Sequence, residues 1–234
     1  MLLSVIIPVY NEQENLVKRL SFLCEQANKF SIEIIISNSP ETTDDSSSVC
    51  KNFSKVTYLR SEKKGRAAQM NFAAEKAKGD VLLFLHADVM LPEDFYTQIE
   101  KAIANNYTFG FFAYQFDNDS AFLNFNSKFT TKDGLFAGGG DQCHFFTKEQ
   151  FQELKGYNEE FCIMEDFEMM TRIRKQKIPF TIIQSKATVS ARKYKHNSWL
   201  KVNLINGYVF LKYKFGVHPN NLRKTYKSLL REGV

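Results

Sequence analysis

Residues 79–92, with the sequence GDVLLFLHADVMLP, decide the fold that we expect for this chain. The unbroken apolar run at 81–85 is typical of a strand that is buried on both faces of a parallel sheet. His86 and Asp88 follow it directly. Because ligands of open α/β sheets bind outside the carboxyl ends of the strands, these two side chains are expected to face a common ligand. Two interpretations are open: a divalent-metal site that holds a phosphate, or a turn in which Asp88 caps the next helix.

The rest of the chain alternates strands and helices around this stretch. Apolar runs predict three earlier strands at 3–9, 32–36 and 56–59, each followed by a helix, the second of which would be capped by Asp44 or Asp45. This order predicts an α/β fold whose first half is a doubly wound, nucleotide-binding sheet. The later expected strands are 107–116, 143–147, 179–183 and 187–192, and the later expected helices are 93–105, 165–175, 198–215 and 220–231. No linker interrupts them, which favours one domain over residues 1–234.

The composition is that of a globular protein with one large core. The 234 residues are 44% hydrophobic and 24% charged, and the net charge of +5 does not require a nucleic-acid partner. The four cysteines have no C-x-x-C spacing, which argues against a zinc site or disulfide framework and favours a cytoplasmic location. The apolar N-terminus predicts a strand and not a signal peptide, and no apolar run reaches the ~20 residues that span a bilayer.

Three polar clusters are expected where the fold exposes strand or loop ends. They are YNE at 10–12, HAD at 86–88 and MED at 164–166. One carboxylate that shares a metal with substrate phosphates suits Mg²⁺ or Mn²⁺, and a His86 ligand would favour Mn²⁺. A carboxylate at the start of the helix 165–175 can take a proton from a hydroxyl group, or it can simply cap that helix. Glu165 and Asp166 are the candidates for this catalytic role.

Two other features each allow two interpretations. The run Gly138-Gly139-Gly140 lacks the Gly-Lys-Ser/Thr of a phosphate loop, so it predicts either a close backbone approach to a ligand or a flexible loop. Near the C-terminus, an apolar stripe with interspersed lysines predicts either a peripheral membrane contact or a helix packed on the domain. The residues of that stripe are Trp199, Val202, Ile205, Val209 and Phe210.

Three segments together resemble the inverting family 2 glycosyltransferases of the GT-A fold. They are SVIIPVYNE at 4–12, GDVLLFLHAD at 79–88 and MEDFEMMTRIR at 164–174. The sequence is most similar to a bacterial subgroup whose LHAD motif is a variant of the family's D-x-D motif. The resemblance implies a mixed GT-A sheet flanked by helices, with a nucleotide-sugar-binding half at 1–106, an acceptor and catalytic half at 107–195, and C-terminal helices at 196–234.

The resemblance also implies a role for each candidate site residue. Asp166, with Glu165 beside it, would be the catalytic base, and Asp88 with His86 would hold Mn²⁺ or Mg²⁺. The residues expected around the nucleotide-sugar donor are Pro8, Tyr10, Glu12, Asn38, Arg66, His86, Asp88, Asp141, Gln142 and Arg192. The implied acceptor is a hydroxyl group, such as that of a lipid-linked or surface-glycan precursor, so the protein would work in the cytoplasm or at the inner face of the membrane. Specificity is expected in the loops 117–142 and 185–197.

One departure from the family pattern keeps other functions open. Ser37 and Asn38 stand where many relatives carry an Asp that binds the base or ribose, and Asn38 is neutral. One alternative is therefore a catalytically degraded module that only binds a nucleotide sugar. A nucleotidyltransferase is a second alternative, although the chain lacks a Gly-rich, basic loop after its first strand.

Overall fold

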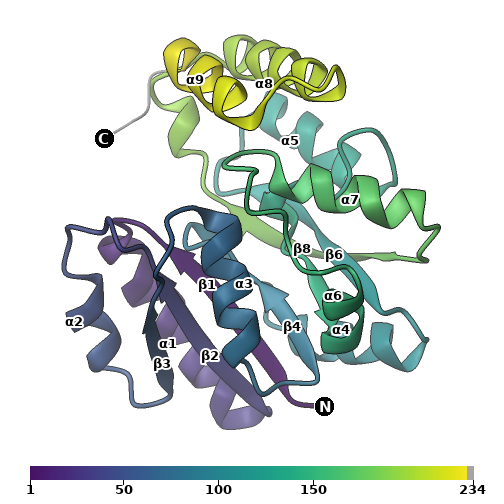
Figure 1. Cartoon of the computed structure of the whole chain (residues 1–234). Coiled ribbons are helices and arrows are strands. Elements are labelled where there is room, and N and C mark those ends of the chain that lie inside the picture. Colours follow the sequence, from purple (N-terminus) through teal and green to yellow (C-terminus); the bar gives the residue numbers. More distant parts are fainter. Residues whose placement is uncertain (231–234) are drawn as a thin grey trace.

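The structure, a computed structural model, describes residues 1–230, which form an eight-stranded sheet with helices on both faces (Figure 1). The strand order is β3-β2-β1-β4-β7-β6-β8-β5, and the first four are mutually parallel. Their bounds are β1 Leu3–Val9, β2 Ile32–Asn38, β3 Val56–Arg60 and β4 Val81–Phe84. β1 and β4 are buried along their whole length, as the apolar runs predicted. The predicted α/β class and its doubly wound first half are confirmed.

Helices return the chain between these parallel strands, because parallel pairing requires a crossover. They are α1 Gln13–Lys29, α2 Ser46–Lys51 and α3 Arg66–Lys76. Of the two predicted caps of α2, Asp44 supplies the bond, since its Oδ1 accepts from the Ser46 backbone N–H at 3.1 Å. Asp45 occupies the N-cap position without a side-chain bond.

The second half of the sheet is mixed. β7 Phe145–Thr147 is antiparallel to both β4 and β6 Phe109–Phe116, and β8 Thr181–Val189 runs parallel to β6. The prediction of two strands at 179–183 and 187–192 was wrong, because β8 is continuous through its polar centre. β8 pairs with β6 on both sides of this polar centre, and the register of the pairing shifts between Phe112 and Tyr114. β5 Val89–Met90 closes the sheet antiparallel to β8.

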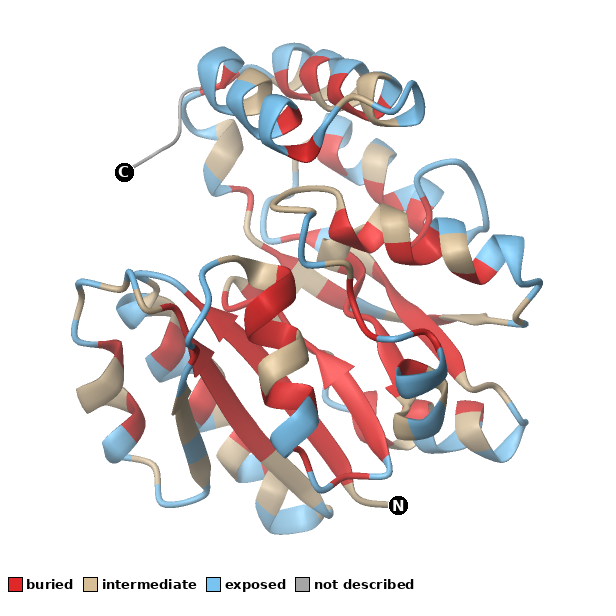
Figure 2. Ribbon diagram, in the orientation of Figure 1, coloured by how far each residue is buried: buried red, intermediate tan, exposed pale blue. Residues whose placement is uncertain are grey.

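The sheet is the middle of three layers. On one face α1, α2 and α4 Phe95–Ala104 pack against β1, β2 and β4. On the other face α3, α6 Lys148–Glu153 and α7 Glu165–Lys175 enclose a core rich in phenylalanine. The central strands lie almost completely buried between these layers (Figure 2). The core thus holds the carboxyl ends of the strands as a rigid edge on which side chains can be positioned.

Some elements were not expected from the sequence. They are β5, α5 Ala121–Lys128, α6, and the 3₁₀ turns Phe129–Thr131, Gly140–Gln142 and Arg192–Tyr194. All are short, and short elements depend more on tertiary contacts than on sequence periodicity. A local signal did exist for α6, because the Thr147 hydroxyl accepts from the Gln150 backbone N–H as an N-cap.

Two C-terminal helices cap the upper end of the molecule. They are α8 Trp199–Lys214 and α9 Pro219–Leu229, which share a small core of their own. The predicted last helix ends at Arg231, which lies outside the described residues, as do residues 232–234. Val202, Ile205, Val209 and Phe210 of the predicted membrane stripe are buried and Trp199 is half-buried, so this face packs on the protein and does not contact a membrane. None of the helices within residues 1–230 is both long enough and apolar enough to cross a bilayer.

Gln69 ties α3 to the sheet at the edge where β1 and β2 end. Its buried side-chain amide donates to the Val9 carbonyl at 2.8 Å and to the Ser37 carbonyl at 2.7 Å. These bonds fix the start of α3 over the strand ends, and buried carbonyl groups that lose such donors cost free energy.

We expect Gln69→Leu to lower the free energy of unfolding by about 2 kcal/mol, because two hydrogen bonds to buried carbonyl groups disappear. Urea denaturation measures this change. Gln152→Leu is the control, since Gln152 is exposed on α6 and should change stability by less than about 0.5 kcal/mol. Equal stability of the two variants would contradict this account of the α3 anchor.

Candidate functional site

Arg192 joins two predicted site residues at the carboxyl edge of the sheet. Its guanidinium donates to Glu12 Oε1 at 2.9 Å and lies 3.4 Å from Asp88 Oδ2. Glu12 precedes α1, and Asp88 follows β4 in the turn before β5. The hydrogen bond with Glu12 is the main reason why the pKa of Arg192 is raised. Three residues that are far apart in the sequence therefore form one charged group, in which the strand ends predicted Glu12 and Asp88 and the resemblance implied Arg192.

A second pair lies beside it. His86 Nδ1 is 3.8 Å from Asp141 Oδ1, so the histidine of the LHAD motif faces the 3₁₀ turn that carries Asp141. Burial opposes ionisation of Asp141, but the bond with His86 and the charges of Lys193 and Arg66 hold the pKa of this carboxyl group well below its usual range. Asp141 is thus a fixed negative charge next to His86.

The third group connects α3 to α7 across 99 positions of the chain. Arg66, the first residue of α3, donates through Nε to the fully buried Glu165 and lies 3.7 Å from Asp166 Oδ2. Burial would lower the pKa of Arg66, yet the two carboxylates raise it. Burial would raise the pKa of Glu165, but the Arg66 charge and hydrogen bond outweigh burial and lower it. Glu165 is therefore ionised and serves as the counter-ion of Arg66.

The pKa of Asp166 is shifted in the direction opposite to that of Glu165. Burial and the adjacent charge of Glu165 raise its pKa to about 7, and Arg66 offsets only part of this effect. Two carboxylates that share one guanidinium cannot both be fully compensated. Asp166 consequently exchanges its proton near neutral pH, which is the property required of a general base.

Gly140 brings the separate groups together. A side chain at this position would overlap Asp166 Oδ2 and the ring of His86, so only glycine allows the 3₁₀ turn to pass between them. Of the two interpretations of the glycine run, close backbone approach holds at this residue, although what it approaches is protein. The turn before α7 is also unusual, because Met164 has a φ of 66° in the left-handed region.

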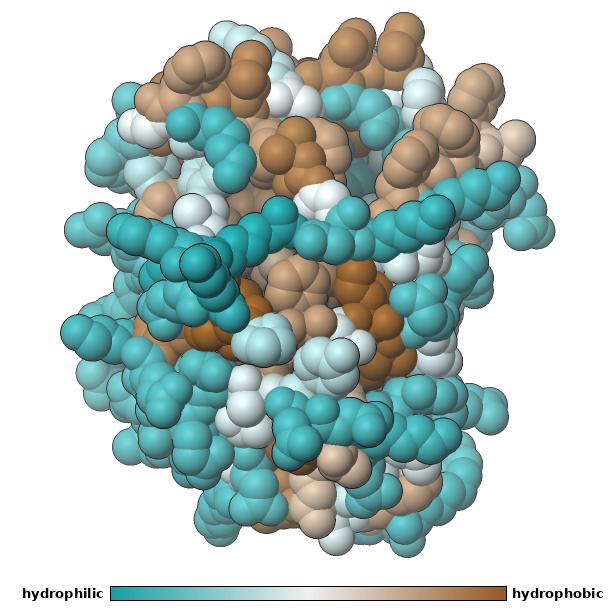
Figure 3. Space-filling model, turned by 90° about the vertical axis from the view of Figure 1, so that its right-hand side faces the viewer, coloured by the Kyte–Doolittle hydropathy of each residue, from teal (hydrophilic) through white to brown (hydrophobic). Residues whose placement is uncertain are grey.

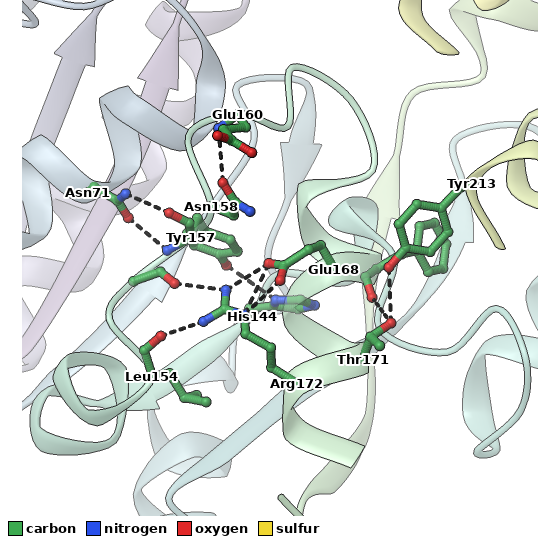
Figure 4. Close-up of polar contacts among 12 residues, drawn as sticks. Asn71, His144, Leu154, Tyr157, Asn158, Glu160, Glu168, Thr171, Arg172 and Tyr213 are labelled. Carbon is green, nitrogen blue, oxygen red and sulfur yellow. Dashed lines mark hydrogen bonds and ion pairs between the residues drawn. The ribbon is translucent and has the colours of Figure 1, made fainter. Parts of the chain in front are cut away.

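A polar network behind α7 holds this helix in place (Figure 4). Arg172 donates to the carbonyl groups of Leu154 and Gly156 and pairs with Glu168 at 2.8 Å. The Tyr157 hydroxyl lies 3.2 Å from Nδ1 of His144, whose Nε2 lies 2.8 Å from the Gly138 carbonyl oxygen. Burial lowers the pKa of His144 to about 4, so this histidine is a neutral part of the core.

Asn71 extends the network to α3. Its side-chain oxygen accepts from the Tyr157 backbone N–H at 2.9 Å, and its Nδ2 donates to the Tyr157 carbonyl at 2.8 Å (Figure 4). Since Asn71 and Arg66 both belong to α3, the helix that carries the guanidinium is fixed to the segment that leads into α7. Both elements of the Arg66–Glu165–Asp166 group are therefore held rigidly.

Two residues that were predicted to bind the sugar donor make hydrogen bonds within the protein. Gln142 is buried, donates to the carbonyl groups of Phe112 and Thr130, and accepts from the Gly138 backbone N–H. We assign it a structural role in place of the predicted donor contact. Asn38 is also buried, and its amide bonds the Tyr58 hydroxyl at 2.8 Å and the Thr42 hydroxyl at 2.7 Å. Its side chain is thus partly engaged within the protein.

The remaining predicted residues lie at the same edge. Pro8 is buried within β1, whereas Tyr10 is 55% exposed immediately after that strand. Two basic residues near the site were not foreseen. Arg19 donates from α1 to the Ala87 carbonyl at 3.1 Å, and the charge of Asp141 raises the pKa of Lys193 although burial lowers it. Neither residue stands in a recognisable motif, so no sequence signal predicts them.

The side chains of the site are suitable ligands for a metal ion that is shared with a substrate. Asp88 offers a partly exposed carboxylate and His86 an imidazole, and Asp141 adds a carboxylate next to His86. Within residues 1–230 no cluster of three or more Asp, Glu, His or Cys side chains is arranged as a complete metal site. Mg²⁺ and Mn²⁺ commonly take only one or two protein carboxylates and complete their shell with phosphate oxygens and water. The side chains present are compatible with such a shared site.

A cavity of about 500 Å³ lies on the other side of Arg192. It is bounded by the segment after β6 and by the segment between β8 and α8. Its lining includes Asp117, Ser120, Ser190, Arg192, Tyr194 and Trp199. These segments fall within or next to the two loops in which specificity was expected.

The mixed eight-stranded sheet between two layers of helices, with charged residues at the carboxyl ends of its strands, is a GT-A fold. The mannosyltransferase PcManGT from Pyrobaculum calidifontis, solved with GDP-Man and Mn²⁺, superposes with a TM-score of 0.69 at 17% identity, over 91% of this chain and 63% of that one. S. aureus TarS 1–349 with UDP-GlcNAc gives a TM-score of 0.63 at 16% identity, over 82% and 59%. At such identities the likeness concerns the fold alone.

The sequence assigns the family. The model of glycosyl transferase family 2 matches residues 4–172, which is more than half of the chain. The chain belongs to this family. The resemblance to the family 2 glycosyltransferases of the GT-A fold is thereby confirmed at the level of family and fold.

Curated relatives match over part of their length. Glycosyltransferase GlyA of Streptococcus pneumoniae is 29% identical over 138 residues, which cover 57% of this chain and 18% of GlyA. An uncharacterized glycosyltransferase of Rickettsia felis is 30% identical over 118 residues, or 50% of this chain and 20% of that protein. The dolichol-phosphate mannosyltransferase of Pyrococcus furiosus is 29% identical over 108 residues, or 45% and 31%. The matched part thus spans less than a third of each relative.

The neighbouring acids Glu165 and Asp166 should affect stability in opposite directions. Because the pKa of Asp166 is raised, its ionisation costs stability increasingly as the pH rises from about 4 to about 7. Asp166→Asn should therefore increase the free energy of unfolding by about 2 kcal/mol at pH 8, and the gain should shrink at pH 5. Because the pKa of Glu165 is lowered, Glu165→Gln should lose stability at pH 8.

Urea denaturation of both variants at pH 5 and pH 8 measures these changes. Asp45→Asn, at an exposed position that makes no capping bond, serves as the control and should change little. An Asp166→Asn protein that is less stable than wild type at pH 8 would contradict the electrostatic description of the pair.

Proposed function

We propose that this protein is an inverting, metal-dependent glycosyltransferase that moves a sugar from a nucleotide-sugar donor to a hydroxyl acceptor. The observation that carries the proposal is the position of Asp166, a buried carboxylate 3.7 Å from the Arg66 guanidinium at the sheet edge that also holds Asp88. Burial and the adjacent Glu165 raise its pKa. A proton acceptor and a partly exposed metal-ligand candidate on one rigid edge are the two parts that direct glycosyl transfer requires. Membership of glycosyl transferase family 2 supports the assignment.

The reaction is a single displacement. Asp166 takes the proton of the acceptor hydroxyl group as its oxygen forms a bond to the anomeric carbon of the donor. The bond from that carbon to the diphosphate oxygen breaks, and the nucleoside diphosphate leaves with the electron pair. Because no second carboxylate is required as a nucleophile, the anomeric configuration inverts.

The other charged residues have supporting roles. Asp88 and His86 would hold Mn²⁺ or Mg²⁺, which, when bound, neutralises charge on the leaving diphosphate. Glu165 keeps Arg66 oriented beside Asp166, and Arg192 is placed to exchange its bonds with Glu12 and Asp88 for bonds with a phosphate. Pro8, Tyr10 and Glu12 would border the nucleotide.

Donor and metal are inferred partly from structural neighbours. PcManGT was solved with GDP-Man and Mn²⁺, TarS with UDP-GlcNAc, and glucosyl-3-phosphoglycerate synthase from Mycobacterium tuberculosis with Mn²⁺ and uridine diphosphate. All three bind a nucleotide sugar or nucleoside diphosphate, and two of them were solved with Mn²⁺, which supports a nucleotide-sugar donor and a divalent ion for this chain. The base is left open, because Ser37 and Asn38 do not supply the acid that many family members use.

The part of the acceptor remote from its reacting hydroxyl group is assigned to the cavity beyond Arg192, which Asp166 does not line and whose hydroxyl, amide and indole groups suit a carbohydrate or polyol. A lipid-linked or surface-glycan precursor, met by a cytoplasmic protein at the inner face of a bacterial membrane, is the acceptor class that we favour. The internal bonds of Asn38 favour one alternative, a module that binds a nucleotide sugar without transferring it.

Donor turnover tests the proposal. Purified protein is screened for release of nucleoside diphosphate from UDP- and GDP-sugars with and without Mn²⁺, and NMR reads the anomeric configuration of the released or transferred sugar. We expect Mn²⁺-dependent release with inversion, and a decrease of about 1000-fold in Asp166→Asn, because the general base is lost. Asp45→Asn should retain wild-type activity.

Three results would contradict the proposed transferase function. Retention of configuration would exclude the single displacement, and full activity of Asp166→Asn would exclude its role as the base. Mn²⁺-dependent binding of a nucleotide sugar without release or transfer would favour the binding module.

A further inference from the structure

Helix α8 is apolar on two opposite sides, and only one of them packs on the protein. The opposite side carries five large apolar residues at spacings of four, four, three and four, which place them in one stripe along the helix. Their exposed fractions are Leu200 59%, Leu204 63%, Tyr208 48%, Leu211 54% and Phe215 80%. No described residue covers this stripe, which we call the α8 outer face.

The charge around the α8 outer face has a single sign. Residues 199–229, which comprise α8 and α9, contain six lysine or arginine residues and no Asp or Glu. Lys201 and Lys212 lie toward one edge of the stripe and Lys214 toward the other, as the helical spacing places them. Lys212 Nζ lies 4.9 Å from the centroid of the Tyr208 ring, so its stem follows the apolar surface.

A neighbouring helix adds further exposed apolar side chains. α5 contacts α8 through a bond from Asn126 Nδ2 to Asn203 Oδ1 of 3.0 Å, and Phe122 packs against Trp199 at 5.1 Å between ring centroids. Phe122 and Phe125 of α5, and Phe129 of the 3₁₀ turn that follows it, are 52–64% exposed. Apolar side chains project from the upper end of the molecule, where Figure 1 places these helices (Figure 3). Such a concentration of large exposed apolar groups marks an interaction surface.

We propose that the α8 outer face lies on an anionic lipid surface, with its leucine, tyrosine and phenylalanine side chains in the interface and its lysines at the headgroups. An apolar stripe bordered by lysines and free of carboxylates matches both the apolar and the negatively charged parts of such a surface. The stripe spacing also permits helix pairing, but a second copy would bring three more lysines against Lys201, Lys212 and Lys214. Charge complementarity therefore favours lipid over self-association.

The position of this surface suits the proposed acceptor site. Trp199, the first residue of α8, lines the cavity beyond Arg192, and the exposed stripe begins at the next residue. A hydroxyl acceptor carried on a lipid would reach the cavity from the bilayer without leaving it. The link to an acceptor rests on the proposed function, whereas lipid binding itself requires neither donor nor metal.

Vesicle flotation without nucleotide or metal tests the proposal. We expect wild-type protein to float with phosphatidylcholine vesicles that contain about 30% phosphatidylglycerol, and not with phosphatidylcholine alone, because both charge and apolar contact are required. Leu204→Ser with Leu211→Ser should reduce flotation at least tenfold, as should Lys201→Gln with Lys212→Gln and Lys214→Gln. Val17→Ser, at an exposed apolar position on α1, is the matched control and should float like wild type.

Circular dichroism melting verifies that each variant is folded, and sedimentation velocity gives the oligomeric state. Absence of wild-type flotation with anionic vesicles would overturn the proposal and leave the transferase reaction untouched. Flotation that persists in both the leucine and the lysine variants would also overturn it. A wild-type dimer that dissociates in the leucine variant, without lipid binding, would assign the α8 outer face to a second copy of the chain.

Discussion

One guanidinium between two buried carboxylates organises this structure. Arg66 at the start of α3 pairs with Glu165 and Asp166 at the start of α7, and so connects the parallel half of the sheet to its mixed half. A single positive charge cannot neutralise two acids. Glu165 takes most of the compensation, and Asp166 is left with a pKa raised to about 7. The bond that stabilises the junction of the two halves thus also creates the group able to accept a proton.

The first half of the fold could be predicted from the sequence because its strands and helices have local, repeating patterns of apolar residues. The runs at 3–9, 32–36 and 81–85 are apolar because those strands are covered on both faces, and the helices between them carry clear periodicity. The continuous strand β8 could not be predicted, since its polar centre at Gln184 and Ser185 lies between two stretches, 181–183 and 187–189, that pair with β6. Such pairing depends on distant residues, so no sequence window contains it.

For the site, too, local patterns could be predicted from the sequence and contacts between distant residues could not. The sequence pattern placed Glu12 and Asp88 at strand ends and Asp166 at the start of a helix, and the resemblance assigned the three to one site. The bond of Arg192 to Glu12, the approach of Asp141 to His86 and the internal use of Gln142 depend on loop conformations that no periodicity encodes. The C-terminal stripe shows this limit most clearly. The sequence identified an apolar helix, but only the structure distinguishes the buried face from the α8 outer face.

The central claim is that Asp88 and the charged groups around it bind a nucleoside diphosphate together with a divalent ion. Isothermal titration calorimetry of UDP and GDP, with and without Mn²⁺, on wild type and Asp88→Asn tests it most directly. We expect one of the two nucleotides to bind only when Mn²⁺ is present, and Asp88→Asn to weaken this binding at least tenfold. Binding that is independent of both Mn²⁺ and Asp88, or no binding of either nucleotide, would contradict it.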